Sequence, residues 1–294
     1  MAKKLHIFID STGDLQKEYR DRYDIDYLPM SVSVDDKQIV ASLDYDQGYT
    51  LHDFYEIMRN GKRIYTSQVS NPTIEENFRR VLNDGEEILY IACSSALSAS
   101  VKAAEVIARG LREEFKGQRI VCFDPKISGY AQGEMAIRAS EMRSQGKDLD
   151  EIVAWLEENM FKFNQFGLVE TLKYLKQAGR VSATSAFFGN LLAVKPIIIS
   201  NRAGENLANV KVKGWKNGVK ETARLTVEAG EDIENKIVWI GHADNMEGAE
   251  LLKEEILKLA TPKEIVIGPS GPIIGASAGP GTLITYVYGK EVLI

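Results

Sequence analysis

Hydroxyl side chains gather in three short segments, each placed where a predicted strand ends. The segments are Asp10–Leu15, Thr66–Ser70 and Ser94–Ser100. In open α/β sheets, ligands bind outside the carboxyl ends of the strands, where hydroxyls and the free N–H groups of a helix start can hold an anion. Any one of these segments also has the composition of a helix cap. The three together favour a site for a carboxylate, which needs donors and no catalytic base.

A fourth segment, the glycine-rich Gly268–Gly281, contains Gly275-Ala276-Ser277-Ala278-Gly279, which matches the G-x-S-x-G elbow of hydrolases. The surroundings do not fit that chemistry. Pro280-Gly281 and a strand-like run follow the serine where the elbow requires a helix, and the last histidine, His242, precedes it. The chain also lacks the G-x-x-x-x-G-K-[ST] and G-x-G-x-x-G phosphate loops, and its three histidines do not have metal-ligand spacing.

These observations favour a binding protein over an enzyme. We expect no catalytic residue, no metal and no cofactor apart from the bound ligand. One alternative stays open, an enzyme that acts on a small phosphorylated or carbonyl substrate at the same loops.

Composition narrows the class of protein. A chain of 294 residues is longer than one hydrophobic core usually spans, which favours two domains. A net charge of −6 argues against nucleic acid as a partner. Cys93 and Cys122 each end an apolar run and are expected to be buried and reduced. Without a signal-peptide core or a bilayer-length apolar stretch, the sequence predicts a cytoplasmic protein with no stable membrane insertion.

Apolar runs alternate with helical patterns through the first half of the chain, which predicts an α/β fold. We expect a Rossmann-like N-terminal domain with a mostly parallel sheet over residues 1–160. The predicted strands are Leu5–Ile9, Tyr27–Val34, Lys37–Ala41 (the last two as a hairpin), Ile88–Cys93 and Arg119–Phe123. The predicted helices are Ser100–Phe115, Tyr130–Arg143 and a helix from the Asp148/Glu151 capping box to Met160.

Neighbouring strands without a helix between them predict a C-terminal α/β domain over residues 161–294, with a mixed or antiparallel sheet and helices. Short helices are expected around Thr171 and Ser185, on either side of a Gly179-Arg180 turn. The predicted strands are Pro196–Ile199, Asn206–Lys213, Lys236–Ile240, Lys263–Ile267 and Leu283–Tyr288. The predicted longer helices are Val219–Glu228 and Met246–Leu259.

The order of these motifs along the whole chain resembles the DegV family, the fatty-acid-binding subunits of bacterial fatty acid kinase. The segments that carry the resemblance are Asp10–Leu15, Thr66–Ser70, Ser94–Ser100, Glu170–Lys176, Gly179–Ser182, Gly189–Leu192 with Lys195-Pro196, and Gly275–Gly281. The resemblance implies that one long-chain fatty acid lies in an apolar tunnel between the two domains. A kinase subunit, which binds the ATP, would then convert the carboxylate to an acyl phosphate.

Carried over residue by residue, the resemblance implies a set of ligand contacts. The carboxylate would be held by Thr66, Ser67, Ser95, Ser98 and Ser277, and the site would be lined by Arg180, Gly275, Ala276, Phe187 and Phe188. The family usually has proline at Val69, glycine and threonine at Ala99 and Ser100, and threonine and histidine at Ala276 and Ser277. Ser277 therefore keeps a donor where the family has an imidazole.

A cluster of lysines in an otherwise acidic chain is the predicted docking surface for the kinase. Lys211, Lys213, Lys216 and Lys220 lie in the strand-to-helix segment after Pro196, where the family resemblance implies a basic patch. Lys211 and Lys213 would point to the same face of the strand Asn206–Lys213. Two other interpretations stay open at this point. The lysines can be a solvated polar edge, and the protein can be a lipid sensor with a partner other than a kinase.

Overall fold

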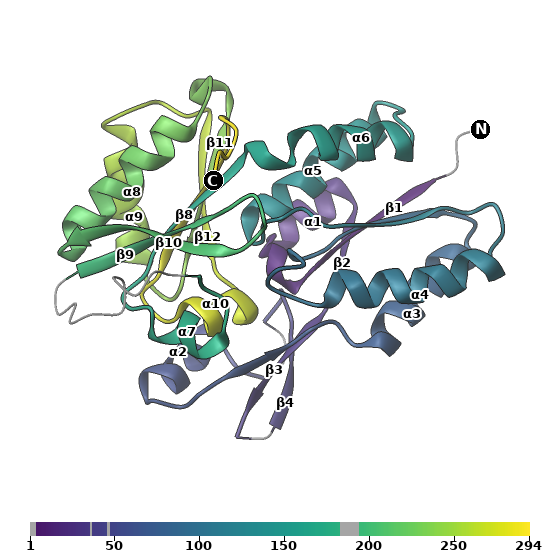
Figure 1. The fold of residues 1–294 in the computed structure, drawn as a ribbon, viewed down its shortest axis with the longest axis horizontal. Coiled ribbons are helices and arrows are strands. Elements are labelled where there is room, and N and C mark those ends of the chain that lie inside the picture. The colour runs from purple at the N-terminus through teal and green to yellow at the C-terminus, as the bar shows by residue number, and fades with distance from the viewer. Residues whose placement is uncertain (1–3, 36, 46–47, 183–193) are drawn as a thin grey trace.

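The computed structural model describes residues 4–35, 37–45, 48–182 and 194–294, which form three sheets with helices between and around them (Figure 1). The first sheet is parallel, with the strand order β2-β1-β6-β7. Its strands are β1 (Leu5–Asp10), β2 (Ile25–Leu28), β6 (Glu87–Ile91) and β7 (Ile120–Phe123). The Rossmann-like sheet expected from the sequence is confirmed.

Helices cover both faces of the parallel sheet. They are α3 (Asn71–Asn83) and α4 (Ser100–Glu114) on one face, α1 (Lys17–Tyr23) and α5 (Tyr130–Ser144) on the other, with α6 (Leu149–Asn159) packed on α5. Successive side chains of a strand point to opposite faces, so Phe8 packs under α3 and α4 while Ile7 and Ile9 pack under α5. This two-sided cover is why β1 and β6 consist of almost uninterrupted buried residues.

The second sheet is mixed and six-stranded, with the order β10-β9-β8-β13-β11-β12. Its strands are β8 (Phe163–Leu168), β9 (Val194–Ser200), β10 (Asn206–Lys213), β11 (Ile237–His242), β12 (Glu264–Pro269) and β13 (Leu283–Tyr288). One face is covered by α8 (Trp215–Ala229) and α9 (Met246–Leu257), and the other faces α5. Because α5 lies between two sheets, it is buried around most of its circumference.

A small third sheet, formed by strands from the first part of the chain, packs against a helix from its end. It is antiparallel, with the order β4-β3-β5, and its strands are β3 (Met30–Val34), β4 (Lys37–Ala41) and β5 (Tyr65–Ser67). The short helix α10 (Pro272–Ala278) packs against β3 and β5 and contacts α2 (Leu51–Arg59) and α7 (Lys173–Ala178) (Figure 1). Helix α10, near the end of the chain, therefore packs in the same layer as β3 and β5, which come from its first part.

Two local expectations were wrong. The stretch Tyr27–Val34 forms two strands, β2 and β3, because Pro29 has no N–H to donate and the chain leaves the parallel sheet there. The glycine-rich segment, predicted as a polar loop, contains the short helix α10, although after Ser277 the chain continues through Pro280-Gly281 into the strand β13 as expected. Pro272 stands in the first turn of α10, where a missing N–H costs nothing, and Gly279 ends the helix at a φ of 89°.

Other expectations have mixed outcomes. The helix expected around Thr171 is α7, and the one around Ser185 lies outside the described residues. The helices α1, α2 and α3 and the strand β8 had not been expected. Every strand of the parallel sheet precedes residue 160 and every strand of the mixed sheet follows it. The division into domains 1–160 and 161–294 stays a prediction.

Candidate ligand site between the two sheets

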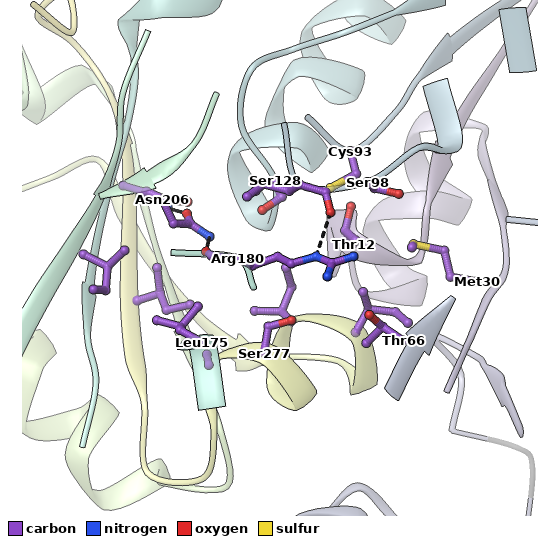
Figure 2. Close-up of a pocket in the computed structure, with 18 of the residues that line it drawn as sticks. Thr12, Met30, Thr66, Cys93, Ser98, Ser128, Leu175, Arg180, Asn206 and Ser277 are labelled. Atoms are coloured by element: carbon purple, nitrogen blue, oxygen red, sulfur yellow. Dashed lines mark hydrogen bonds between the residues drawn. The ribbon is translucent and has the colours of Figure 1, made fainter. Parts of the chain in front are cut away.

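A cavity of about 180 Å³ lies where the carboxyl ends of β1 and β6 face the mixed sheet and α10 (Figure 2). Most of its wall is apolar, and the apolar lining residues are Met30, Leu97, Ala99, Gly167, Val169, Leu175, Ile198, Ile273, Ile274, Ala278 and Ile284. The polar lining residues are Thr12, Thr66, Gln68, Cys93, Ser98, Ser128, Gln165, Arg180, Asn206, Ser277 and Tyr286. An elongated apolar ligand with a polar end fits such a lining.

Asp10 organises the floor of the cavity. This fully buried carboxylate at the end of β1 accepts hydrogen bonds from the Thr12 N–H at 3.0 Å, the Cys93 N–H at 2.8 Å, the Tyr90 hydroxyl at 3.0 Å and the Gln132 Nε2 at 3.2 Å. The Thr12 hydroxyl also lies within hydrogen-bond distance of it. Asp10 thus holds the loops after β1 and β6 against α5, and two of its partners, Thr12 and Cys93, line the cavity.

Three hydroxyl residues reach the cavity from three different elements. Thr66 lies on β5 opposite Val32, Ser98 precedes α4, and Ser277 lies in the last turn of α10. The Ser98 Oγ accepts the Ser100 N–H at 3.2 Å and lies 3.0 Å from the Ser100 Oγ, which fixes its direction at the start of the helix. Segments far apart in sequence therefore bring together the donors that a carboxylate needs.

Arg180 lies among these hydroxyls (Figure 2). Gly179, at a φ of 67°, ends α7 and turns the chain so that the next side chain enters the cavity. The Arg180 Nε donates to the Leu97 carbonyl at 3.0 Å and one Nη donates to the Ala178 carbonyl. Within the described ranges, no carboxylate oxygen forms an ion pair with the guanidinium. Arg180 consequently retains unused donors and an unbalanced charge.

A second, smaller hollow of about 130 Å³ adjoins the cavity. Thr66, Arg180 and Ser277 line both spaces, so the two spaces meet at the hydroxyl cluster. The smaller hollow is bordered by Lys62 and Arg63, which are exposed. It offers a route from the hydroxyl end of the cavity toward the surface.

The structure does not bring every predicted contact residue to the cavity. Ser67 follows Thr66 on β5, so it points to the opposite face and is exposed. The Ser95 N–H donates to Asp124 and its hydroxyl accepts from Lys126, which directs Ser95 away from the cavity. Gly275 packs against the Tyr55 hydroxyl, and Ala276 borders only the smaller hollow. Phe187 and Phe188 lie outside the described residues.

Several lining residues had not been expected. Thr12 lies within a segment that the sequence singled out and Cys93 directly precedes another. Gln165 and Asn206 lie on strands of the mixed sheet, where nothing distinguishes them from other strand residues. Ser128 and Tyr286 are placed by the packing of α5 on β13. These residues could be identified as lining residues only once it was known which distant strands pair.

Apart from Arg180, the titratable side chains that line the cavity are Cys93 and Tyr286, and both stay neutral at physiological pH. Burial, reinforced by the Asp10 carboxylate, raises the pKa of the Cys93 thiol. Burial also raises the pKa of Tyr286 well above its ordinary value, with a further contribution from Asp14. A protonated thiol is a poor nucleophile. Cys93 thus lacks the electrostatic activation that a catalytic thiol has.

One cluster with the ligand types of a metal site lies away from the cavity. Side-chain atoms of His52, Glu56 and Asp244 lie within 4.8 Å of one another. Arg59 pairs with the Glu56 carboxylate at 2.7 Å and the Asp244 carboxylate at 2.5 Å, so a cation already occupies this position. The cluster therefore gives little support for a metal.

No helix within the described residues combines the length and apolar composition that a bilayer crossing requires.

The fold and the cavity define a class, an α/β protein that encloses a mostly apolar pocket with one cationic, hydroxyl-lined end between a parallel and a mixed sheet. A family model described as an uncharacterised protein of the DegV family matches residues 4–288. The chain belongs to the DegV family.

Known proteins of this family are similar over almost their whole length. A DegV domain-containing protein of Clostridium perfringens is 34% identical over 287 residues, which is 98% of each chain. Among solved structures, a DegV family protein from Thermus thermophilus, described by its fatty acid binding, has a TM-score of 0.87 at 26% identity, covering 98% of this chain and 100% of that one. A fatty acid binding DegV family protein from Streptococcus agalactiae has a TM-score of 0.87 at 25% identity, covering 99% and 100%.

Proposed function

We propose that this protein binds one long-chain fatty acid in the cavity, with the carboxylate at the end where Thr66, Ser98, Arg180 and Ser277 meet. The observation that carries this proposal is Arg180, a cation without an anionic partner in the described part of the chain, at the hydroxyl end of an apolar cavity. The similarity to solved proteins described as fatty acid binding supports it.

The energetics of such a complex divide between the two ends of the ligand. Each methylene transferred from water to the apolar wall contributes roughly 0.8 kcal/mol, so the tail supplies most of the affinity. The hydroxyls and Arg180 supply the donors that a buried carboxylate requires, because an unpaired buried charge costs several kcal/mol. Ser277 provides a hydroxyl at the position where the family resemblance implies histidine, and Arg180 provides the charge.

The lining of the cavity favours binding over catalysis. Among the described residues that line it, none is a histidine, an aspartate or a glutamate. A hydrolase or transferase acting here would need a base within hydrogen-bond reach of its nucleophile. An enzyme for a small phosphorylated or carbonyl substrate is therefore the weaker proposal.

The purified protein is expected to carry about one long-chain fatty acid per chain, because a mostly apolar cavity gains free energy by exchanging water for a lipid tail. Native mass spectrometry before and after solvent extraction, with gas chromatography of the extract, measures this. A preparation that is free of ligand and also binds no added fatty acid would refute the proposal.

We further propose that the bound carboxylate is presented to a partner kinase, which forms the acyl phosphate with its own ATP. The smaller hollow supports this, because it leads from the hydroxyl cluster to a surface that carries Lys62 and Arg63. The predicted lysine patch is also exposed, on β10 and the start of α8. Lys213 lies seven residues along β10 from the cavity-lining Asn206, roughly 23 Å away at the usual rise per residue.

Reversing Lys62 and Arg63 to glutamate is expected to slow phosphorylation of the bound fatty acid about ten-fold at low salt, since charges at an interface mainly steer association. The assay mixes loaded protein with a fatty acid kinase catalytic subunit and Mg-ATP, and traps acyl phosphate with hydroxylamine. The matched variant Lys211→Glu/Lys213→Glu tests the patch predicted from the sequence. Equal phosphorylation rates for both variants and the wild type would show that neither surface is part of the interface with the kinase. A loaded protein that is never phosphorylated would favour a sensor.

A further inference from the structure

Three further polar side chains line the cavity, and each has at least one polar atom without a hydrogen-bond partner among the described residues. They are Ser128, Gln165 and Tyr286, with exposed fractions of 5%, 8% and 1%. Within the described residues, neither the Ser128 hydroxyl nor the Tyr286 hydroxyl forms a hydrogen bond. The Gln165 Nε2 donates to the Asn206 Oδ1 at 2.8 Å, which leaves the Gln165 Oε1 as a free acceptor.

The three side chains lie close to one another. Gln165 on β8 and Tyr286 on β13 are directly paired in the antiparallel sheet, so their side chains stand next to each other on the same face. The Tyr286 hydroxyl fills the space where a Cβ at Gly129 would stand, which places it beside the residue that follows Ser128. The loop that precedes α5 and two strands of the mixed sheet therefore build one polar position.

This polar position lies away from the smaller hollow, which Thr66, Arg180 and Ser277 border and which Ser128, Gln165 and Tyr286 do not. In Figure 2, Ser128 lies across the Arg180 side chain from Ser277 and Thr66, on the same side as Ser98. A plain alkyl tail passing over Ser128, Gln165 and Tyr286 would remove them from water without giving them partners, which is unfavourable for buried polar groups. The position therefore calls for a polar group in the ligand's chain or for an ordered water.

We propose that Ser128, Gln165 and Tyr286 form a second polar subsite that takes a hydroxyl group on the ligand's chain, so that the preferred ligands are long-chain fatty acids with a mid-chain hydroxyl. This inference rests on the proposed fatty acid binding. A hydroxyl matches the subsite because it can accept from the Tyr286 hydroxyl and donate to the Gln165 Oε1 at the same time. A keto group can only accept, and would leave the Gln165 Oε1 without a donor.

The test compares matched ligands on delipidated protein. The pairs are oleic with ricinoleic acid and stearic acid with its mid-chain hydroxystearic isomers, and the corresponding oxostearic acid is a further probe. At least one hydroxy acid is expected to bind about ten-fold or more tightly than its parent acid, because its hydroxyl would form hydrogen bonds with buried groups that otherwise have no partner. The oxo acid is expected to show a smaller preference.

Tyr286→Phe removes only the hydroxyl and is expected to bring the ratio of affinities close to one. Ser128→Ala is a second variant should Tyr286→Phe fail to fold, and is expected to reduce the ratio as well. Tyr288→Phe is the matched control, because it lies on the same strand and its hydroxyl bonds Asn159 away from the cavity. This control should keep the wild-type ratio.

The possible results separate the two proposals. Equal affinity of the wild type for hydroxy and parent acids would mean that the subsite holds an ordered water only, and would overturn this inference while fatty acid binding stands. A preference that survives in both Tyr286→Phe and Ser128→Ala would also overturn it. Failure to bind any of these acids would overturn the proposed function itself.

Discussion

Replacing Arg180 by methionine is expected to weaken fatty acid binding by about 100-fold, or roughly 3 kcal/mol, because a buried carboxylate would lose its cationic partner. Methionine keeps an unbranched side chain of similar reach and removes the guanidinium. Displacement of a fluorescent fatty acid from delipidated protein measures the change. The melting temperature of the ligand-free variant checks that the loss is not a folding defect, since Arg180 also bonds the Leu97 carbonyl.

Two further variants sharpen this experiment. Arg180→Lys retains the charge without the planar fork of donors, and is expected to bind with an affinity between those of the wild type and the methionine variant. Arg22→Met removes a charge from α1, away from the cavity lining, and is expected to bind as the wild type does. Unchanged affinity in Arg180→Met would place the carboxylate elsewhere in the cavity.

Asp10→Ala is expected to lower the free energy of unfolding by about 3–5 kcal/mol, because several buried donors would lose their acceptor at once. Those donors are the N–H groups of Thr12 and Cys93, the Tyr90 hydroxyl and the Gln132 amide. Urea unfolding of delipidated protein measures the loss, and delipidation is needed because a bound ligand stabilises the native state.

The matched control for this variant is Asp26→Ala. Asp26 lies on the neighbouring strand and pairs with His6 and Arg80 at the surface, with its side chain 52% exposed. Exposed ion pairs contribute about 0–1 kcal/mol, so this variant should unfold close to the wild-type midpoint. Equal midpoints for the two aspartate variants would show that Asp10 does not hold the floor of the cavity together.

Local patterns in the chain were sufficient to predict most of the regular structure. The buried strand β6 and the helix α4 follow from an apolar run and from apolar residues at helical spacing, signals that depend on neighbours in sequence alone. The capping box of α6 is likewise local, and Asp148 and Glu151 form it as expected. Pro29 shows the limit of such patterns, because which sheet each side of the proline joins depends on partners elsewhere in the chain.

The residues of the site were also predicted only in part. The hydroxyl-rich segments are visible in the sequence, and the resemblance to the DegV family implied Thr66, Ser98 and Ser277 as contact residues within them. The structure places all three at the cavity. The direction of each side chain was not visible. One position along β5 separates the inward Thr66 from the outward Ser67, and the hydrogen bonds of Ser95 turn it toward Asp124.

The second polar position could come only from tertiary structure. Gln165 and Tyr286 are far apart in the chain and meet because β8 and β13 pair in one register, while Ser128 joins them because α5 packs between the two sheets. Residue types and local spacing determine which segments become strands, helices and candidate donors. Strand register and helix packing depend on contacts between distant segments, and these decide which side chains share the cavity.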